Sequence, residues 1–203
     1  MIRVQWKQEY SDFDREIRQR GKKFLQSCPT PNSTQFNKHN YWKKALNELH
    51  AAYDGLCAYT SRELIDGGTV DHFKPKSKYP LLAYEWDNYR LARQQINQRK
   101  GNSEDVADPF QIDDGWFILD LPSCLIKPGN NLSADARKIV KATINTLQLN
   151  HDERLVEERR NLLVYLADDM ITLKFLDKHY PFLSAEVKRQ NVIDSLRNIF
   201  SRQ

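Results

Sequence analysis

Residues 70–80, VDHFKPKSKYP, decide how the rest of this chain is interpreted. Asp71 stands directly before His72, and three lysines and two prolines follow within eight residues. The residues around the pair predict a short strand over 69–73. Two readings of the pair are open. It is either a polar couplet with His72 bonded to the backbone, or a metal ligand beside a general base.

The residues after this stretch predict a unit of two strands and a helix. A long basic and aromatic loop separates 69–73 from a second expected strand at 89–92, and 94–100 is expected to be a helix. Adjacent residues of a strand point to opposite faces. The end of the first strand must therefore twist or bulge if Asp71 and His72 are to serve one site.

Two asparagines follow at spacings that suit a ββα-metal nuclease site. Asn88 opens the second strand, and Asn97 lies nine residues further on, in the expected helix. A hard divalent ion takes oxygen ligands, which the Asp71 carboxylate and the Asn97 amide supply. Such an ion stabilises the leaving oxygen of a phosphodiester, while a neutral His72 removes a proton from water.

Several ordered motifs carry a resemblance to known proteins. The set DHF-x-P, W-x-N and IN-x-x-KG resembles that of HNH endonucleases. The wider set CAYT, VDHFKPKSKYP, YEWDNYRLARQQINQRKG and TINTLQLN is similar to the HNH nuclease subunit of Septu-type and retron-associated anti-phage systems, the PtuB type. The resemblance is strong over 57–101 and weaker over 143–160.

The resemblance implies a role for each polar residue of the unit. His72 would be the general base, and Asp71 and Asn97 would be the ligands of one Mg²⁺ or Mn²⁺ ion. Asn88 would belong to the catalytic set as the residue that braces the loop carrying the base. Lys100 would face a phosphate or the developing negative charge.

The sequence departs from this family at an expected zinc site. Family members commonly carry two Cys-x-x-Cys pairs that bind a structural zinc ion. Here the first reads Cys57-Ala-Tyr-Thr60 and the second Arg93-Gln-Gln-Ile96. One thiolate cannot hold a tetrahedral zinc ion. We therefore expect no structural zinc, with Ile96 and Thr60 packing in its place.

Charge is concentrated in the same part of the chain. The net charge is +4, and over 74–100 seven basic residues face only Glu85 and Asp87. Basic residues that meet phosphates release counterions, so binding to DNA or RNA would depend strongly on salt. The alternative is a solvated loop. The residues expected to face phosphate are Lys74, Lys76, Lys78, Arg93 and Lys100.

The flanking sequence is expected to be mainly helical. Apolar spacing predicts one helix within 11–27 and another over 36–53. After an irregular excursion at 103–131, Ser133 is expected to cap a helix. A long helix over 155–176 would end at Pro181, and Ser184 would cap a final helix to about residue 199.

The expected architecture is α+β, mainly α with a small embedded ββα-metal (HNH) unit. The expected parts are an N-terminal helical segment (1–55), the HNH unit (56–102) and a C-terminal helical region (103–203), packed as a single compact domain. Three distant cysteines suggest no disulfide framework. Without an apolar run of bilayer length or a signal-peptide core, we expect a bacterial cytoplasmic protein with no membrane partner.

Two functions are consistent with the sequence. The first is a metal-dependent endonuclease that acts as the toxic effector of an anti-phage complex. By resemblance, its partners would be a PtuA-like ATPase subunit and, in retron-linked systems, a reverse transcriptase with its DNA–RNA hybrid. The second is a catalytically silent subunit that binds nucleic acid or the ATPase. The identity of the substrate, DNA or RNA, phage or host, stays open.

Overall fold

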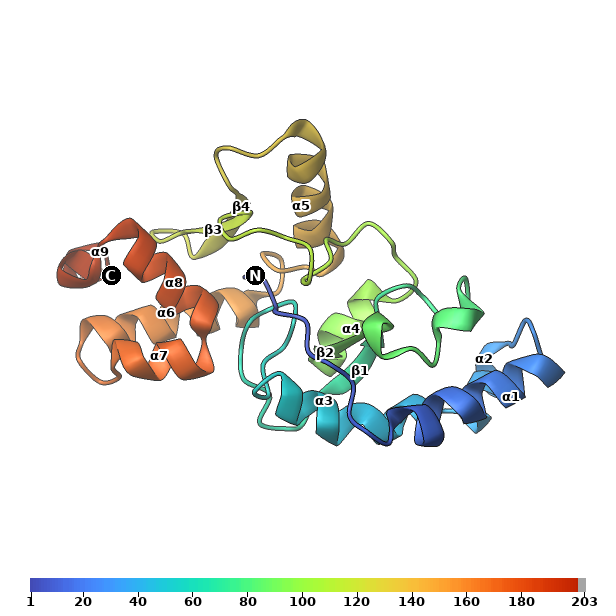
Figure 1. The fold of residues 1–203 in the computed structure, drawn as a ribbon. Coiled ribbons are helices and arrows are strands. Elements are labelled where there is room, and N and C mark those ends of the chain that lie inside the picture. The colour runs from blue at the N-terminus through green and yellow to red at the C-terminus, as the bar shows by residue number, and fades with distance from the viewer. Residues whose placement is uncertain (201–203) are drawn as a thin grey trace. The chain divides into compact units, whose positions relative to one another are not determined.

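The computed structural model describes residues 1–200, which form two compact units (Figure 1). Unit 1 comprises Met1–Val4, Thr60–Arg62 and the chain from Asp105 onward. Unit 2 comprises Gln5–Tyr59 and Glu63–Glu104. Most of the expected N-terminal segment and most of the expected ββα unit therefore belong to the same compact unit. Helices predominate, and the two sheets are small and antiparallel, so the fold class is α+β.

The centre of unit 2 is a two-stranded antiparallel sheet followed by a helix. Strand β1 (Thr69–His72) pairs with β2 (Tyr89–Ala92), and α4 (Gln94–Lys100) follows directly. In this register Asp71 lies opposite Arg90, and His72 lies opposite Tyr89. The strand–loop–strand–helix order predicted from the sequence is confirmed. The first strand ends one residue earlier than predicted.

Short helices complete unit 2. The loop between the strands contains two 3₁₀ turns, η3 (Pro80–Leu82) and η4 (Trp86–Asn88). A π-helical turn precedes the first α-helix at the N-terminal end of the unit. The elements before the sheet are η1 (Asp14–Arg18), α1 (Gln19–Ser27), α2 (Ser33–Lys38), η2 (Tyr41–Ala45) and α3 (Leu46–Ala52).

The single helix predicted over 36–53 is wrong, because the chain breaks after α2. The Tyr84 hydroxyl donates to the His39 carbonyl at 2.9 Å. In a continuous helix this carbonyl would accept the Lys43 N–H. The Lys43 N–H bonds to the Asn40 carbonyl instead, which produces the 3₁₀ turn η2. A contact from a residue distant in sequence therefore sets this boundary.

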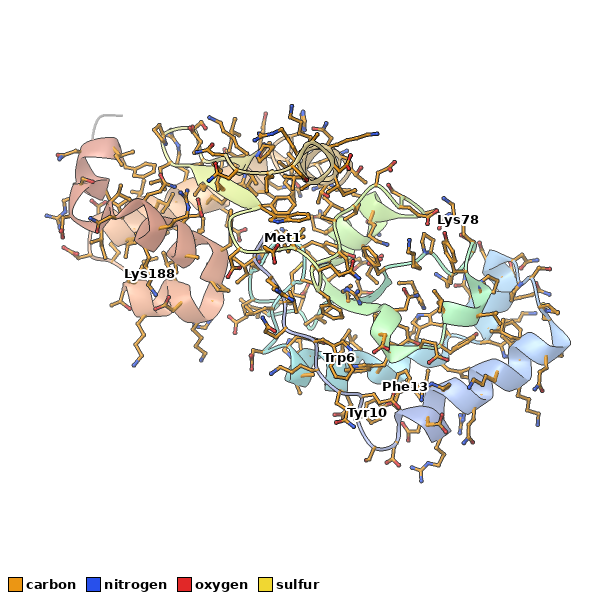
Figure 2. The ribbon with its side chains drawn as sticks, turned by 45° about the horizontal axis from the view of Figure 1, so that its top comes forward. Met1, Trp6, Tyr10, Phe13, Lys78 and Lys188 are labelled. Atoms are coloured by element: carbon orange, nitrogen blue, oxygen red, sulfur yellow. The ribbon has the colours of Figure 1, made fainter. Side chains whose placement is uncertain are left out.

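Aromatic side chains build the core of unit 2 between the N-terminal segment and the sheet. The Phe13 ring meets Trp86 and Tyr89 edge to face, with ring centroids 5.5 and 5.8 Å apart. Tyr10 and Phe13 lie near one another in Figure 2, and Tyr10 also contacts Trp86. Trp6 donates its indole N–H to Asp87 at 2.8 Å. These contacts attach the N-terminal segment to the chain that leads into β2.

Unit 1 combines a β-hairpin with helices. Strand β3 (Phe117–Asp120) pairs antiparallel with β4 (Leu125–Pro128), within the segment predicted to be irregular. Ser133 caps the next helix by accepting a bond from Ala136 N–H, as predicted. The helical elements that follow are α5 (Ala134–Thr146), α6 (Glu153–Ala167), α7 (Leu173–His179), α8 (Pro181–Gln190), η5 (Ile193–Ser195) and α9 (Leu196–Phe200).

The long helix predicted over 155–176 is two helices. Asp169 has a positive φ of 57°, which ends the first helix, and the Thr172 side chain accepts from Phe175 N–H to cap the second. Pro181 begins α8 instead of ending its predecessor. Ser184 is not a cap, because it is buried within α8 and donates to Asp177 at 2.6 Å.

Polar side chains on α6 and α8 bind the hairpin of unit 1. The Glu186 carboxylate accepts from Leu119 N–H at 2.6 Å, and Arg159 donates to the Cys124 carbonyl at 2.8 Å. These bonds satisfy backbone groups that the two-stranded sheet leaves unpaired. Within the described residues, no helix is both long and apolar enough to cross a membrane.

Candidate functional site

Strand β1 delivers Asp71 and His72 into the interior of unit 2. Asp71 is 2% exposed and His72 is 6% exposed. The Asp71 carboxylate accepts a bond from the Tyr59 hydroxyl at 2.5 Å and a bond from Lys100 Nζ at 3.1 Å. The Lys100 ammonium also donates to the His72 carbonyl at 2.8 Å. Each carboxylate oxygen of Asp71 therefore already has a donor.

The Lys100 side chain is fully buried at the end of α4. This placement differs from the expectation that Lys100 faces a phosphate, because α4 packs on β1 and brings the ammonium onto the carboxylate. Burial raises the pKa of the Asp71 carboxyl, and the Lys100 ammonium and the Tyr59 hydroxyl oppose that rise. Asp71 and Lys100 form an ion pair shielded from water.

The His72 imidazole is held in one tautomer. Its Nε2 lies 2.9 Å from the Ala83 carbonyl oxygen, which can only accept, so Nε2 carries the hydrogen. This leaves Nδ1 as the basic nitrogen. Burial, followed by the positive charge of Lys76, lowers the pKa of His72 to about 3. The ring is therefore neutral at pH 7 and has a lone pair ready to accept a proton.

Two aromatic rings fix the plane of His72. Trp42 from η2 and Tyr89 from β2 meet the imidazole edge to face, with centroids 4.9 and 5.3 Å away. From the sequence, Trp42 is only a residue of the helix predicted over 36–53, and Tyr59 only a residue of the CAYT motif. Trp42 gives no local signal of its role. Tyr59 could have been noted as a hydroxyl donor within a motif that the resemblance already covered.

Asn88 connects the two ends of the loop between the strands. Its amide oxygen accepts from Lys74 N–H at 2.7 Å, and its amide nitrogen donates to the Lys74 and Leu82 carbonyls, both at 3.0 Å. The backbone carbonyl of Asn88 also accepts from Phe73 N–H at 2.8 Å. Asn88 therefore fixes the backbone that leaves His72, and its side chain is taken up by these bonds.

Asn97 projects from α4 towards β1. Its amide nitrogen donates to the Val70 carbonyl at 3.3 Å. One helical turn later, Lys100 contacts Asp71 and His72. Asn97 therefore bonds to the residue that directly precedes Asp71 in β1. The amide oxygen of Asn97 has no hydrogen bond from the residues that the structure describes.

This arrangement can be tested for its fit to a divalent ion. Asp71 and Asn97 provide the oxygen ligands that Mg²⁺ and Mn²⁺ prefer. Asp71 already binds a cation, however, in the form of the Lys100 ammonium. Over residues 1–200, no cluster of three or more His, Cys, Asp or Glu side chains is arranged to hold a metal. The ligand chemistry fits, on the condition that Lys100 leaves the carboxylate.

The other basic residues differ in their surroundings. Burial lowers the pKa of Lys76, whose ammonium lies 5.2 Å from the centroid of the Trp42 ring. The Asp71 carboxylate opposes this lowering, but Lys76 makes no salt bridge within the described part of the chain. Lys74 and Lys78 both pair with Glu104. Arg93 precedes α4, and its side chain is partly exposed.

The two expected cysteine-pair positions meet in the structure. The Cys57 thiol accepts from Arg93 N–H at 3.4 Å, so the start of the first pair touches the start of the second. Ile96 is completely buried at the other end of the second position. Among residues 1–200, the buried Thr60 hydroxyl has no hydrogen-bond partner. Of these four positions, only Cys57 carries a thiol, and Ile96 is packed in the interior.

Comparison with known proteins gives one partial similarity. No protein-family model matches the sequence. The Septu protein PtuB of Bacillus thuringiensis is 30% identical over 122 residues, which cover 59% of this chain. The match covers 45% of PtuB, so the chain spans less than half the length of this curated relative.

Proposed function

We propose that this chain is a Septu-related anti-phage defence protein and that unit 2 hydrolyses nucleic-acid phosphodiester bonds. The partial similarity to PtuB supports the defence role. The observation that carries the catalytic proposal is the state of His72. This buried imidazole is neutral and is fixed as the Nε2–H tautomer, and the Lys100 ammonium that pairs with the Asp71 carboxylate also donates to the His72 carbonyl.

His72 would act as the general base. The bond from Nε2 to the Ala83 carbonyl directs Nδ1 to take the proton, so a water molecule bonded to Nδ1 becomes the nucleophile. A pKa near 3 makes the free imidazole a weak base. A phosphate anion that approaches Lys76 would offset the positive charge beside the ring and raise this pKa. Substrate binding would therefore strengthen the base.

Asp71 and Asn97 would hold one Mg²⁺ or Mn²⁺ ion in this proposal. Such an ion supplies charge neutralisation at the departing oxygen of the phosphodiester. Lys100 would have to release the carboxylate when the ion binds, because two cations cannot share one buried acid without strong repulsion. Tyr59 would keep its bond to the carboxylate and hold it in place.

A second function has its own support. The Asp71–Lys100 pair satisfies the expected metal ligand without any ion. A chain that keeps this pair permanently would bind nucleic acid or a partner subunit and would not cut. This is the catalytically silent subunit considered from the sequence.

Cleavage by the purified protein distinguishes the two functions. The protein, together with the PtuA-like ATPase proposed as its partner, is incubated with DNA and with RNA in the presence of Mn²⁺. We expect cleavage that His72→Ala abolishes and that His151→Ala, a matched change at an exposed histidine of unit 1, leaves intact. Full cleavage by a folded His72→Ala protein would overturn the catalytic proposal. Binding without cleavage by the wild type would favour the silent subunit.

The proposed partners follow from the defence role. A PtuA-like ATPase subunit is the proposed stable partner, with a retron reverse transcriptase and its DNA–RNA hybrid in retron-linked systems. The proposed location is the bacterial cytoplasm, where these partners and the nucleic acid are found. Co-purification with the products of neighbouring genes tests this set directly.

A further inference from the structure

Three donors converge on one carboxylate at the exposed edge of the loop between β1 and β2. Glu104 accepts from the Tyr79 hydroxyl at 2.7 Å, from Lys78 Nζ at 3.0 Å and from Lys74 Nζ at 3.5 Å. The bond from Tyr79, followed by that from Lys78, lowers the pKa of Glu104 to about 2. This carboxylate is therefore negatively charged throughout the physiological range. We refer to Lys74, Lys78, Tyr79 and Glu104 as the Glu104 cluster.

The donors are positioned by the loop itself. Asn88 bonds to both backbone groups of Lys74, and the Pro75 carbonyl accepts from the N–H groups of Lys78 and Tyr79. The Lys74 ammonium also lies 5.4 Å from the centroid of the Tyr79 ring. These contacts do not involve Glu104. The three donors would therefore stay close together if the carboxylate left.

Glu104 reaches the cluster from a different part of the chain. It lies 25 to 30 residues from its three partners and follows α4. One further bond, from the Ser77 hydroxyl to the Asn102 side chain at 3.0 Å, attaches this segment to the loop. Lys78 extends outward from the loop (Figure 2), and its side chain is 51% exposed. An external anion can therefore approach the ammonium groups.

We infer that Lys74, Lys78 and Tyr79 form a subsite for a backbone phosphate of nucleic acid, and that Glu104 occupies this subsite as an internal anion until nucleic acid displaces it. The inference rests on the proposed function for the class of ligand. A phosphodiester has two anionic oxygens that accept the same ammonium and hydroxyl donors as a carboxylate. Two of the three lysines in the stretch thus share one carboxylate in the free protein.

An internal competitor lowers the apparent affinity for nucleic acid. The observed affinity is the intrinsic affinity multiplied by the fraction of molecules in which the subsite is open. Glu104→Gln removes the charge and keeps an acceptor for the Tyr79 hydroxyl. We expect roughly tenfold tighter binding for this variant, which corresponds to an open fraction of about one tenth in the wild type.

The salt dependence of binding provides a second readout. This slope of log affinity against log salt reports how many phosphates the lysines neutralise in the complex, at about 0.9 per phosphate of duplex DNA. Nucleic acid displaces Glu104 from the wild type as well, so Glu104→Gln should leave the slope almost unchanged, whereas Lys74→Ala with Lys78→Ala should lower it by about 1.8. Fluorescence anisotropy with labelled single-stranded and duplex oligonucleotides, in EDTA to prevent cleavage, measures both quantities.

Two controls make the test specific. Glu48→Gln on α3 adds the same charge at an exposed position outside the cluster, and it should change affinity much less. Combining Glu104→Gln with Lys74→Ala and Lys78→Ala should remove the gain. Equal effects of Glu104→Gln and Glu48→Gln, or a gain that persists without both lysines, would overturn the inference.

The outcome is separable from that of the proposed function. Binding is measured without a divalent ion, so a failure of cleavage leaves the result for the Glu104 cluster unaffected. Conversely, if the Glu104 cluster does not bind phosphate, the proposal of hydrolysis at His72 is unaffected. Lys74→Ala with Lys78→Ala in the Glu104 background completes a double-mutant cycle with Glu104→Gln. The two alanines should weaken binding less there than in the Glu104→Gln background.

Discussion

At the residue scale, the Asp71–Lys100 pair is the feature on which the site depends. Both side chains are buried away from water, and the charge of each balances that of the other. Removing one member of a buried pair leaves an uncompensated charge, which costs more than the pair contributes when it is intact. The same carboxylate is the proposed metal ligand. Stability and metal binding should therefore respond in opposite directions to changes at Lys100.

Lys100→Met tests this coupling. The substitution leaves the Asp71 carboxylate buried with only the Tyr59 hydroxyl, so we expect a loss of about 3 to 5 kcal/mol in the free energy of unfolding. Urea denaturation measures the change. Adding Asp71→Asn removes the stranded charge and should restore most of the loss. Equal instability of the single and double variants would show that the pair does not carry the effect.

The neutral state of His72 gives a second prediction, on pH. The pKa of this ring is about 3 in the folded protein, against an ordinary value of 6.5. Between these pH values the His72 ring is protonated in the unfolded chain and neutral in the folded protein. Stability due to this group is therefore complete above pH 6.5 and falls as the pH drops towards 3.

The expected loss is about 2 kcal/mol in the free energy of unfolding between pH 7 and pH 5. His72→Gln keeps a donor for the Ala83 carbonyl and does not titrate, so its stability should fall less over the same interval. Urea unfolding at several pH values compares the two proteins. Parallel pH profiles would contradict a buried, neutral His72.

At the element scale, local pattern was sufficient for the central unit. The turn and strand signals around 70–80 gave both strands and α4 to within one residue. The Ser133 cap was likewise predicted, because a cap is a local hydrogen bond. The hairpin of β3 and β4 was missed. Its strands are as short as β1 and β2, but Pro122 lies between them and Pro128 is the last residue of β4, and prolines argue against a strand.

Contacts between distant residues account for the remaining differences. The break after α2 depends on a hydroxyl 45 residues away, and the Asp71–Lys100 pair joins residues 29 apart. Apolar periodicity contains no information about either. The sequence identified Asp71, His72, Asn88 and Asn97 as neighbours in one unit. It did not reveal that Lys100 would occupy the carboxylate, nor that Trp42 would pack on the imidazole.

Helix α1 supplies an element-scale prediction through Gly21. A Cβ atom at Gly21 would lie 2.1 Å from Cγ of Tyr84, so the helix approaches this ring as closely as glycine allows. An alanine in a helix normally stabilises it relative to glycine by about 1 kcal/mol. Here the clash should dominate, and Gly21→Ala should destabilise the protein by about 1 to 3 kcal/mol.

Thermal and urea unfolding test this prediction, with Lys22→Ala as the control at an exposed position of the same helix. The control should change stability by less than about 0.5 kcal/mol. Because Tyr84 also holds the His39 carbonyl and contacts Trp42, displacement of its ring should reach the environment of His72. Stabilisation by Gly21→Ala would mean that the ring moves away at little cost.

At the scale of the whole molecule, charge is divided unequally between the two units. Unit 2 contains sixteen Lys or Arg against twelve Asp or Glu, and unit 1 contains fifteen of each. The entire net charge of +4 therefore belongs to the unit that contains the candidate site. An excess of positive charge on one unit favours binding of nucleic acid there.

This asymmetry gives the last prediction. Two double variants each lower the net charge by two. The first pair, Lys76→Met with Arg93→Met, lies in unit 2, and the second pair, Lys138→Ala with Lys141→Ala, lies on α5 of unit 1. A general charge effect would be the same for both pairs. Direct phosphate contacts would instead lower the slope of log affinity against log salt by about 1.8 for the first pair only. Anisotropy titrations between about 50 and 200 mM salt, in EDTA, measure the slope. Equal slopes for the two double variants would place nucleic-acid binding outside the candidate site, since the local excess of charge would then have no specific role.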